Sequence, residues 1–301
     1  LTALIVVCGV EKGIENVSRV LMPVLIILAV VICIYVVLLP GSAAGLKYYL
    51  LPDFSKFSLK TVCAAMGQMF YSMSLAMGIM ITYGSYTRDD VSMVKSVNQI
   101  EIFDTGVAFL AGAMIIPAVY VFSGTEGMGA GPSLMFISLP KVFSAMGKAG
   151  TFVGILFFVT AIFATLSSCI SVLESITANC MEIFHTSRKK TVLVLSVIYL
   201  AASAVIALGY SIFYVEVKLP NGSVGQLLDI MDYISNSVMM PFIALLSTLL
   251  IGWIVTPDYV ISEMERSGDK FRRKKLYRVM IRFVAPVMMF ILFLQSTGIL
   301  S

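Results

Sequence analysis

Long apolar blocks alternate with short polar stretches along this chain. Seven blocks are long enough to cross a membrane, because about 20 apolar residues in a helix span the roughly 30 Å of hydrocarbon. Lipid offers no partners to backbone N–H and C=O groups, so a spanning segment here must be helical. The pattern therefore predicts an all-α polytopic membrane protein, with spans at about 18–39, 60–86, 95–122, 150–183, 189–210, 226–254 and 278–298.

Composition supports this class. Apolar residues make up 59% of the 301 residues and charged residues 13%, whereas soluble domains carry about 25% charged residues. The five cysteines show no CxxC spacing, which argues against a disulfide framework or a zinc site. Residues 1–10 resemble the tail of a hydrophobic segment, so we expect a single transmembrane domain over 1–301 that lacks its N-terminal part.

Lys and Arg predict the orientation, because they accumulate in cytoplasmic loops. Fifteen of the 21 fall on the side that holds Lys12, Arg88, Arg188 and the run 272–275, and six fall on the other side. We therefore expect a multi-pass protein of the cell membrane whose N-terminal end, before the 18–39 helix, is cytoplasmic. The net charge of +4 requires no nucleic acid partner, because the run 272–275 adjoins a membrane helix and can face the anionic lipid bilayer.

The outer loop 123–148 is rich in glycine at first and then becomes amphipathic at 138–146. It is too short and too polar to span a membrane. We expect an extracellular capping loop with a helical part that covers a vestibule.

The second span carries the most informative segment, GQMFYSMSLAMG at 67–78. It places glycines, an amide and hydroxyls at the depth of the bilayer centre. A helix broken there exposes backbone groups that can bind a cation or a carboxylate, provided that protein or water shields them from lipid. The alternative is a continuous helix whose small residues permit close packing, and this segment alone leaves both open.

Small and polar residues recur along the fourth span at steps of three or four, and such spacing places them on one helix face. They are Ala164, Ser167, Ser168, Ser171, Ser175, Ala178, Asn179 and Glu182. The alternative is interhelical hydrogen bonding, worth about 1 kcal/mol per contact, which needs no acid at the far end. The stripe therefore favours an ion or substrate pathway.

Asp104 and Asp232 are further carboxylates within predicted spans. Such groups are costly in a membrane and by default face a cavity, although each of the two has the alternative of lying in headgroup water. No motif of a soluble enzyme competes, since there is one histidine and no phosphate-binding loop. The other classes left open are an ion channel and a non-transporting membrane sensor.

Six short motifs occur in order along the chain: GVEKGIE at 9–15, LPDF at 51–54, GQMFYSMS at 67–74, ITYGSY at 81–86, SLP at 138–140 and LSS at 166–168. In these motifs the chain resembles the bacterial branch of the neurotransmitter:sodium symporter family. The resemblance implies a partial leucine-transporter-like inverted-repeat fold with a discontinuous helix at about 60–86. It matches the seven spans to family helices five to eleven, so helices one to four would be missing and needed for activity. The implied function is sodium-coupled symport of a neutral, hydrophobic or aromatic amino acid by alternating access.

The resemblance also implies two sodium sites, each half present in this chain. The side chains of Ser72 and Asp104 would belong to the first site. The carbonyl of Ala164 and the hydroxyls of Ser167 and Ser168 would belong to the second, and such oxygen donors suit a hard cation.

Chloride is not expected as a cofactor. Asp104 stands where the family commonly has Asn, and Ala108 stands where chloride-dependent members have Ser. The fixed negative charge of Asp104 would balance the cation.

The remaining implied roles concern the substrate pocket and the gates. Lining the pocket would be Tyr71, Ser74, Met77 and Val172. The outer gate would include Gln68 and Asp232. The inner gate would include Tyr86 and Glu182, with the tyrosine hydrogen-bonding nearby.

Overall fold

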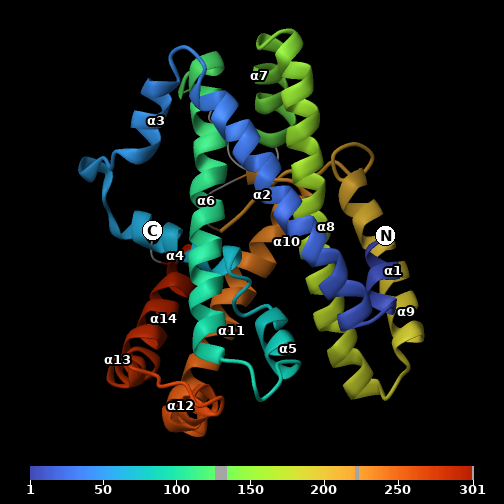
Figure 1. Cartoon of the computed structure of the whole chain (residues 1–301), viewed down its shortest axis with the longest axis vertical. Helices are drawn as coiled ribbons and strands as arrows, with labels where there is room; N and C mark the ends of the chain where they lie inside the picture. The colour runs from blue at the N-terminus through green and yellow to red at the C-terminus, as the bar shows by residue number, and fades with distance from the viewer. Residues whose placement is uncertain (126–133, 221–223, 300–301) are drawn as a thin grey trace. The chain divides into compact units, whose positions relative to one another are not determined.

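A computed structural model describes residues 1–125, 134–220 and 224–299 of the chain, and helices dominate these residues (Figure 1). They fall into two compact units, each built from two separate stretches: Leu1–Ser55 with Ile102–Ser171, and Lys56–Glu101 with Val172–Ser301. Two long helices, α6 (Met93–Ser123) and α8 (Lys148–Phe184), contribute residues to both units.

The first unit holds several further elements beside its parts of α6 and α8. They are α1 (Thr2–Val7), η1 (Val10–Glu15), α2 (Asn16–Val37), α3 (Ser42–Leu50), η4 (Leu134–Ser138) and α7 (Leu139–Ala145), while the short turn η2 (Phe54–Lys56) ends at the boundary.

The second unit holds the broken helix and the C-terminal helices. Its elements are α4 (Leu59–Ser72), α5 (Ile79–Ser85), α9 (Arg188–Leu208), β1 (Val217–Lys218), β2 (Val224–Gly225), α10 (Leu227–Asp232), η5 (Tyr233–Met239), α11 (Met240–Leu249), η6 (Leu250–Val255), α12 (Pro257–Glu265), α13 (Lys274–Val279), η7 (Met280–Val284) and α14 (Ala285–Ser296).

Six continuous helices in the described residues are long and apolar enough to cross a membrane. They run over Lys12–Val37, Met93–Ser123, Lys148–Phe184, Arg188–Leu208, Leu227–Val255 and Lys274–Ser296. These helices confirm six of the seven predicted spans, with shifts of a few residues at most ends. The seventh predicted span, 60–86, is divided into α4 and α5 (Figure 1).

The core of the first unit joins α2, α6, α7 and α8. Val142 of α7 is fully buried among Val36, Val119 and Phe157, which come from the other three helices. Burial of one such side chain contributes roughly 1.5–3 kcal/mol. The helix expected at 138–146 is present as α7 and is part of a packed core, and its role as a cap stays a prediction. Gly127, Gly129 and Gly131 of the predicted capping loop lie outside the described residues.

Two further helices lie outside the predicted spans, where the sequence pattern indicated no helix. At α3, a Cβ on Gly45 would lie 2.7 Å from Pro117 Cα of α6, so only glycine permits this close approach of the two helices. The second helix, α12, follows the span that ends at Val255. Both have nine residues, too few to span a membrane.

In the second unit, hydrogen bonds join the end of the span 227–255 to the first turns of the span 274–296. Trp253 Nε1 donates to the carbonyl of Arg282 over 3.1 Å, and Arg282 Nε donates to the carbonyl of Gly252 over 3.1 Å. A Cβ on Gly252 would lie 2.8 Å from the Ile281 carbonyl oxygen. The reciprocal bonds therefore depend on glycine at this position.

Candidate functional site

The helix that carries the GQMFYSMS motif begins with a side-chain cap and ends in the middle of the predicted span. Ser58 Oγ accepts a hydrogen bond from the Thr61 amide over 3.2 Å, which satisfies one of the free N–H groups of the first turn. The helix ends at Ser72, and α5 starts at Ile79. Six residues between them leave α geometry, as the discontinuous-helix prediction required.

Backbone conformation explains the break. The backbone φ angles of Ser74, Ala76 and Gly78 are 52°, 60° and 76°, in a region that residues other than glycine rarely adopt. The regular helical hydrogen bonds end here. Instead, the Ser74 amide donates to the Tyr71 carbonyl over 3.1 Å, and the Leu75 amide donates to the Phe70 carbonyl over 2.9 Å. Two non-glycine residues with positive φ in one turn indicate a conformation held by its surroundings.

The second half of the broken helix is fastened to α8. Thr82 Oγ1 lies 3.1 Å from Ser175 Oγ and donates to the Gly78 carbonyl over 3.0 Å. A Cβ added to Gly78 would lie 3.2 Å from the same Ser175 oxygen. Thr82 and Ser175 are both buried. Ser175 of the predicted polar stripe therefore supports the break directly.

At the end of α5, Tyr86 belongs to a part-buried network with Glu174 and Arg188, two residues that the sequence pattern did not connect with it. Tyr86 Oη donates to Glu174 Oε1 over 2.8 Å, and Arg188 Nη2 donates to Glu174 Oε2. The Glu174 side chain is 0% exposed, and that of Arg188 is 23% exposed. A carboxylate within a span is itself a signal of function, and Glu174, three residues after Ser171 and four before Ala178, carries that signal in the sequence.

The network gives Tyr86 a different carboxylate from the one expected. Glu182, eight residues later on α8, is exposed. Since Glu174 is buried and bonded by both Tyr86 and Arg188, it is the acid that links α5, α8 and α9 in this structure. The inner-gate role of Glu182 stays a prediction.

Two of the residues predicted for the second sodium site are hydrogen-bonded to each other within α8, in the first unit. Ser167 Oγ donates to the Ala164 carbonyl over 2.7 Å, and Ser171 Oγ donates to the Ser167 carbonyl over 3.1 Å. Hydroxyls in helices often bond the carbonyl a turn earlier, so these contacts arise without an ion. Ser168 is exposed on the same helix.

The first predicted sodium site draws on both units. Ser72 is the last residue of α4 in the second unit, and Asp104 lies on α6 in the first unit. Their meeting stays a prediction. In the second unit, Ser74 and Met77 lie in the break itself, Tyr71 lies in the last turn of α4, and Val172 lies on α8 two residues before Glu174.

Both predicted outer-gate residues are exposed. Gln68 lies on α4, one turn before the break. Asp232 ends α10, where the helix widens into the π-helical segment η5, and its Oδ1 accepts from Asn236 Nδ2 over 2.6 Å. π-Helical turns frequently occur at functional sites.

Spanning helices, a broken helix and a buried ion-paired carboxylate are features typical of polytopic membrane transporters. The model of the Sodium:neurotransmitter symporter family matches residues 1–300. The chain belongs to this family.

Individual relatives agree with this assignment. The chain is 33% identical to the uncharacterized sodium-dependent transporter YhdH of Bacillus subtilis, over 100% of this chain and 65% of YhdH. It is 27% identical to the uncharacterized sodium-dependent transporter MJ1319 of Methanocaldococcus jannaschii, over 100% of this chain and 60% of that protein. These relatives are transporters and not enzymes.

A solved structure shares the fold. The crystal structure of MhsT in complex with L-phenylalanine matches with a TM-score of 0.83 and 34% sequence identity, over 98% of this chain and 65% of that chain. The match confirms the leucine-transporter-like fold class. The chain thus spans 60–65% of the length of these relatives.

Proposed function

We propose that the protein, together with the part of the fold that its relatives have and this chain lacks, is a sodium-coupled symporter of a neutral, hydrophobic or aromatic amino acid. The observation that carries the proposal is the break at residues 73–78, where three residues with positive φ open the helix. Opened helix ends supply the carbonyls and N–H groups that bind ions and substrate carboxylates in transporters. The substrate class is supported by MhsT, whose crystal structure contains L-phenylalanine.

The residues that we propose as sodium and substrate ligands are those that the family resemblance implies. Ser72 and Asp104 would contribute to one sodium site. Ala164, Ser167 and Ser168 would contribute to the other. The pocket would be lined by Tyr71, Ser74, Met77 and Val172, with Met77 as an adaptable apolar wall.

Coupling would arise from differential affinity for two arrangements of the helices. Sodium at both sites favours the outward-facing arrangement, the amino acid adds the closing contacts, and loss of the second sodium to the cytoplasm releases the inward-facing arrangement. We propose that Tyr86, Glu174 and Arg188 form a clasp that holds the closed inner side. Its bonds between α5, α8 and α9 support this role.

The clasp and the excess of Lys and Arg would face the cytoplasm. Two ion pairs in the second unit tie the segment after α5 to the segment after α12: Arg266 with Asp89 at 3.2 Å, and Lys95 with Asp269 at 3.5 Å. These cations are among those assigned to the cytoplasm, so their grouping supports the proposed orientation.

We also propose that transport does not require chloride. The carboxylate of Asp104 supplies a fixed negative charge beside the first sodium, and Ala108 offers no hydroxyl to a chloride ion. The full-length Asp104→Asn variant should then bind sodium more weakly or acquire a need for chloride.

A competition experiment tests the substrate class. Full-length protein in detergent is incubated with labelled L-phenylalanine and a panel of unlabelled amino acids, in sodium and in choline buffers. We expect apolar and aromatic amino acids to displace the label only in sodium. Displacement by lysine or glutamate as effective as that by leucine would contradict the substrate class. After reconstitution into a planar bilayer, a sodium current that does not depend on amino acids would instead indicate a channel.

A further inference from the structure

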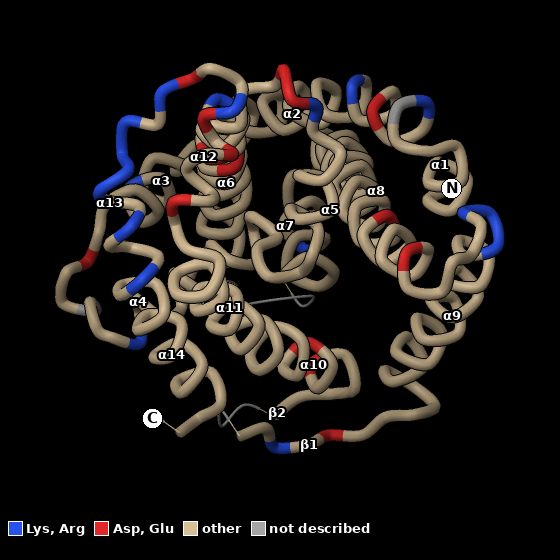
Figure 2. Tube along the Cα trace, turned by 90° about the horizontal axis from the view of Figure 1, so that it is seen from below, with Lys and Arg blue, Asp and Glu red and all other residues tan. Residues whose placement is uncertain are grey.

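The basic character of the chain is concentrated in one segment that follows the span Leu227–Val255 and runs into the first turns of the span Lys274–Ser296. Residues 257–282 contain eight Lys and Arg and four Asp and Glu. The excess of four positive charges equals the net charge of the whole chain. Figure 2 shows these charges gathered along α12, α13 and the stretch between them.

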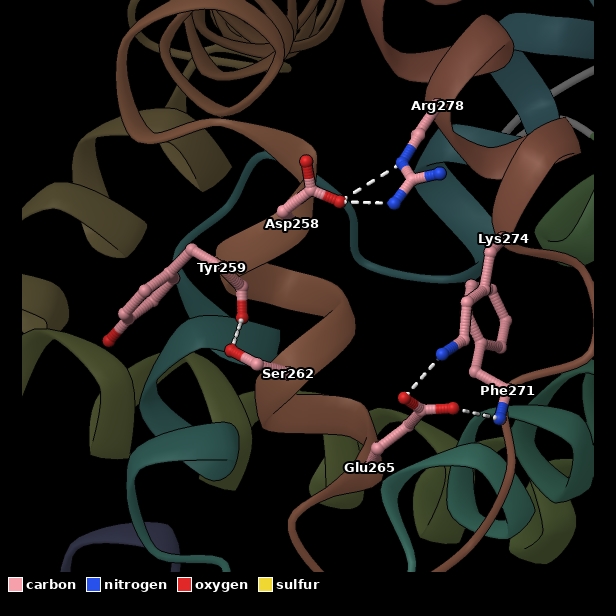
Figure 3. A network of polar contacts seen from close by, with 7 residues as sticks. All are labelled: Asp258, Tyr259, Ser262, Glu265, Phe271, Lys274 and Arg278. Atoms are coloured by element: carbon pink, nitrogen blue, oxygen red, sulfur yellow. Dashed lines mark hydrogen bonds and ion pairs between the residues drawn. The ribbon is translucent and has the colours of Figure 1, made fainter.

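Local acids neutralise only some of these cations (Figure 3). Glu265 accepts from Lys274 Nζ and from the Phe271 amide, the latter over 2.9 Å, and so closes the turn between α12 and α13. Arg278 Nε donates to Asp258 over 3.0 Å. Both acids are thereby occupied by the helix that follows them.

Four further cations of this segment have no ion pair among the described residues. They are Lys270, Arg272, Arg273 and Lys275, and all four are exposed. They line a cavity of about 810 Å³ that residues 268–276 and Glu265 form. This volume lies within the range of sites for small ligands. Lys270, Arg272, Arg273 and Lys275 thus stay outside the Lys274–Glu265 and Arg278–Asp258 ion pairs, and the cavity lining holds more cations than carboxylates.

An apolar surface continues from the cavity along the same helix. Leu276, Val279 and Phe283 are each more than half exposed over the first turns of the span Lys274–Ser296. Trp253, also more than half exposed, packs edge-on against Phe283 with ring centroids 5.7 Å apart. Tryptophan is enriched at the level of lipid headgroups. The cationic cavity therefore lies where a spanning helix enters the headgroup region.

We propose that the cavity formed by residues 268–276 binds the phosphate headgroup of an anionic phospholipid, whose acyl chains lie along Leu276, Val279 and Phe283. Arg272 and Arg273 bind phosphate oxygens through their guanidinium groups, which suit this geometry. Lys270 and Lys275 add charge. A zwitterionic lipid brings its own cation into the cavity and binds more weakly.

Native mass spectrometry of the full-length protein in detergent tests this site. Phosphatidylglycerol and phosphatidylcholine are titrated separately, and bound lipid is counted. We expect a preference for phosphatidylglycerol that R272Q/R273Q weakens about 30-fold, since each basic residue at an anionic surface is worth about fivefold in affinity. The matched control is K189Q/K190Q, which removes two exposed cations at the start of α9. It should change the affinity less than threefold.

Three outcomes would overturn the proposal. The first is equal binding of the two lipids by the wild type, and the second is an equal loss in both double variants, which would indicate unspecific charge attraction. The third is displacement of phosphatidylglycerol by an equal concentration of inorganic phosphate, which would indicate a site for free anions. If R272Q/R273Q does not purify, Lys275→Gln alone should weaken binding about fivefold.

Discussion

Tyr86 donates a hydrogen bond of 2.8 Å to Glu174, a carboxylate 88 positions later in the chain. Arg188 bonds the other oxygen of the same carboxylate. Because Glu174 is fully buried, water cannot take the place of either partner when that partner is removed. The end of α5 is therefore tied to α8 and α9 by groups that are costly to separate.

This relationship predicts an order of stability among single variants. Arg188→Gln leaves a buried carboxylate without its cation and should destabilise the protein by about 3–5 kcal/mol. Tyr86→Phe removes one hydrogen bond to a charged group and should cost about 1.5–3 kcal/mol. Thermal unfolding of the full-length protein in detergent measures both. Glu182→Gln on the exposed side of α8 is the control and should change stability by less than about 0.5 kcal/mol. Arg188→Gln as stable as this control would contradict the clasp.

The break in the helix predicts a contrast between two glycines of the same segment. Gly78→Ala places a Cβ at φ 76° and 3.2 Å from Ser175 Oγ, so we expect a loss of about 1–2 kcal/mol. Gly84→Ala lies inside α5 with nothing within 4 Å of the added carbon, so we expect no loss. Unfolding midpoints of the two variants measure the difference. Equal stability would show that the positive φ at Gly78 is not needed.

The second sodium site predicts a change in sodium dependence without a change in fold. Ser167→Ala and Ser168→Ala each remove one proposed oxygen ligand, and each should raise the sodium concentration for half-maximal uptake about tenfold or more. Cys169→Ala, at the next position of α8, is the control. Unchanged sodium dependence in both serine variants would remove this site from the account.

Acidification should loosen the turn between α12 and α13 only at low pH. The hydrogen bond from Lys274, followed by that from the Phe271 amide, lowers the pKa of Glu265 below its usual 4.5. A lowered folded-state pKa means that the contribution to stability is present above pH 4.5 and is lost as pH falls through the folded-state value. The difference in unfolding midpoint between wild type and Glu265→Gln should therefore be constant from about pH 7 to 5 and shrink below that. A difference that vanishes by pH 6 would contradict the ion pair.

Much of the fold follows from the sequence because the length of an apolar stretch is enough to predict a membrane-spanning helix. The break was predicted through the family resemblance, because the glycines and hydroxyls of the segment 67–78 alone left a continuous helix open. Glu174 was not identified, since its partners Tyr86 and Arg188 come from other helices and no spacing rule connects them. The sequence did not predict the helices α3 and α12 or the ribbon of β1 and β2, because short elements depend on tertiary contacts rather than on periodicity.

Sodium-driven uptake tests the central claim most directly. Full-length protein is reconstituted into liposomes, and accumulation of labelled L-phenylalanine is followed under an inward sodium gradient. We predict accumulation above equilibrium that disappears when choline replaces sodium and persists when gluconate replaces chloride. Equal accumulation in choline and in sodium would contradict sodium-coupled symport.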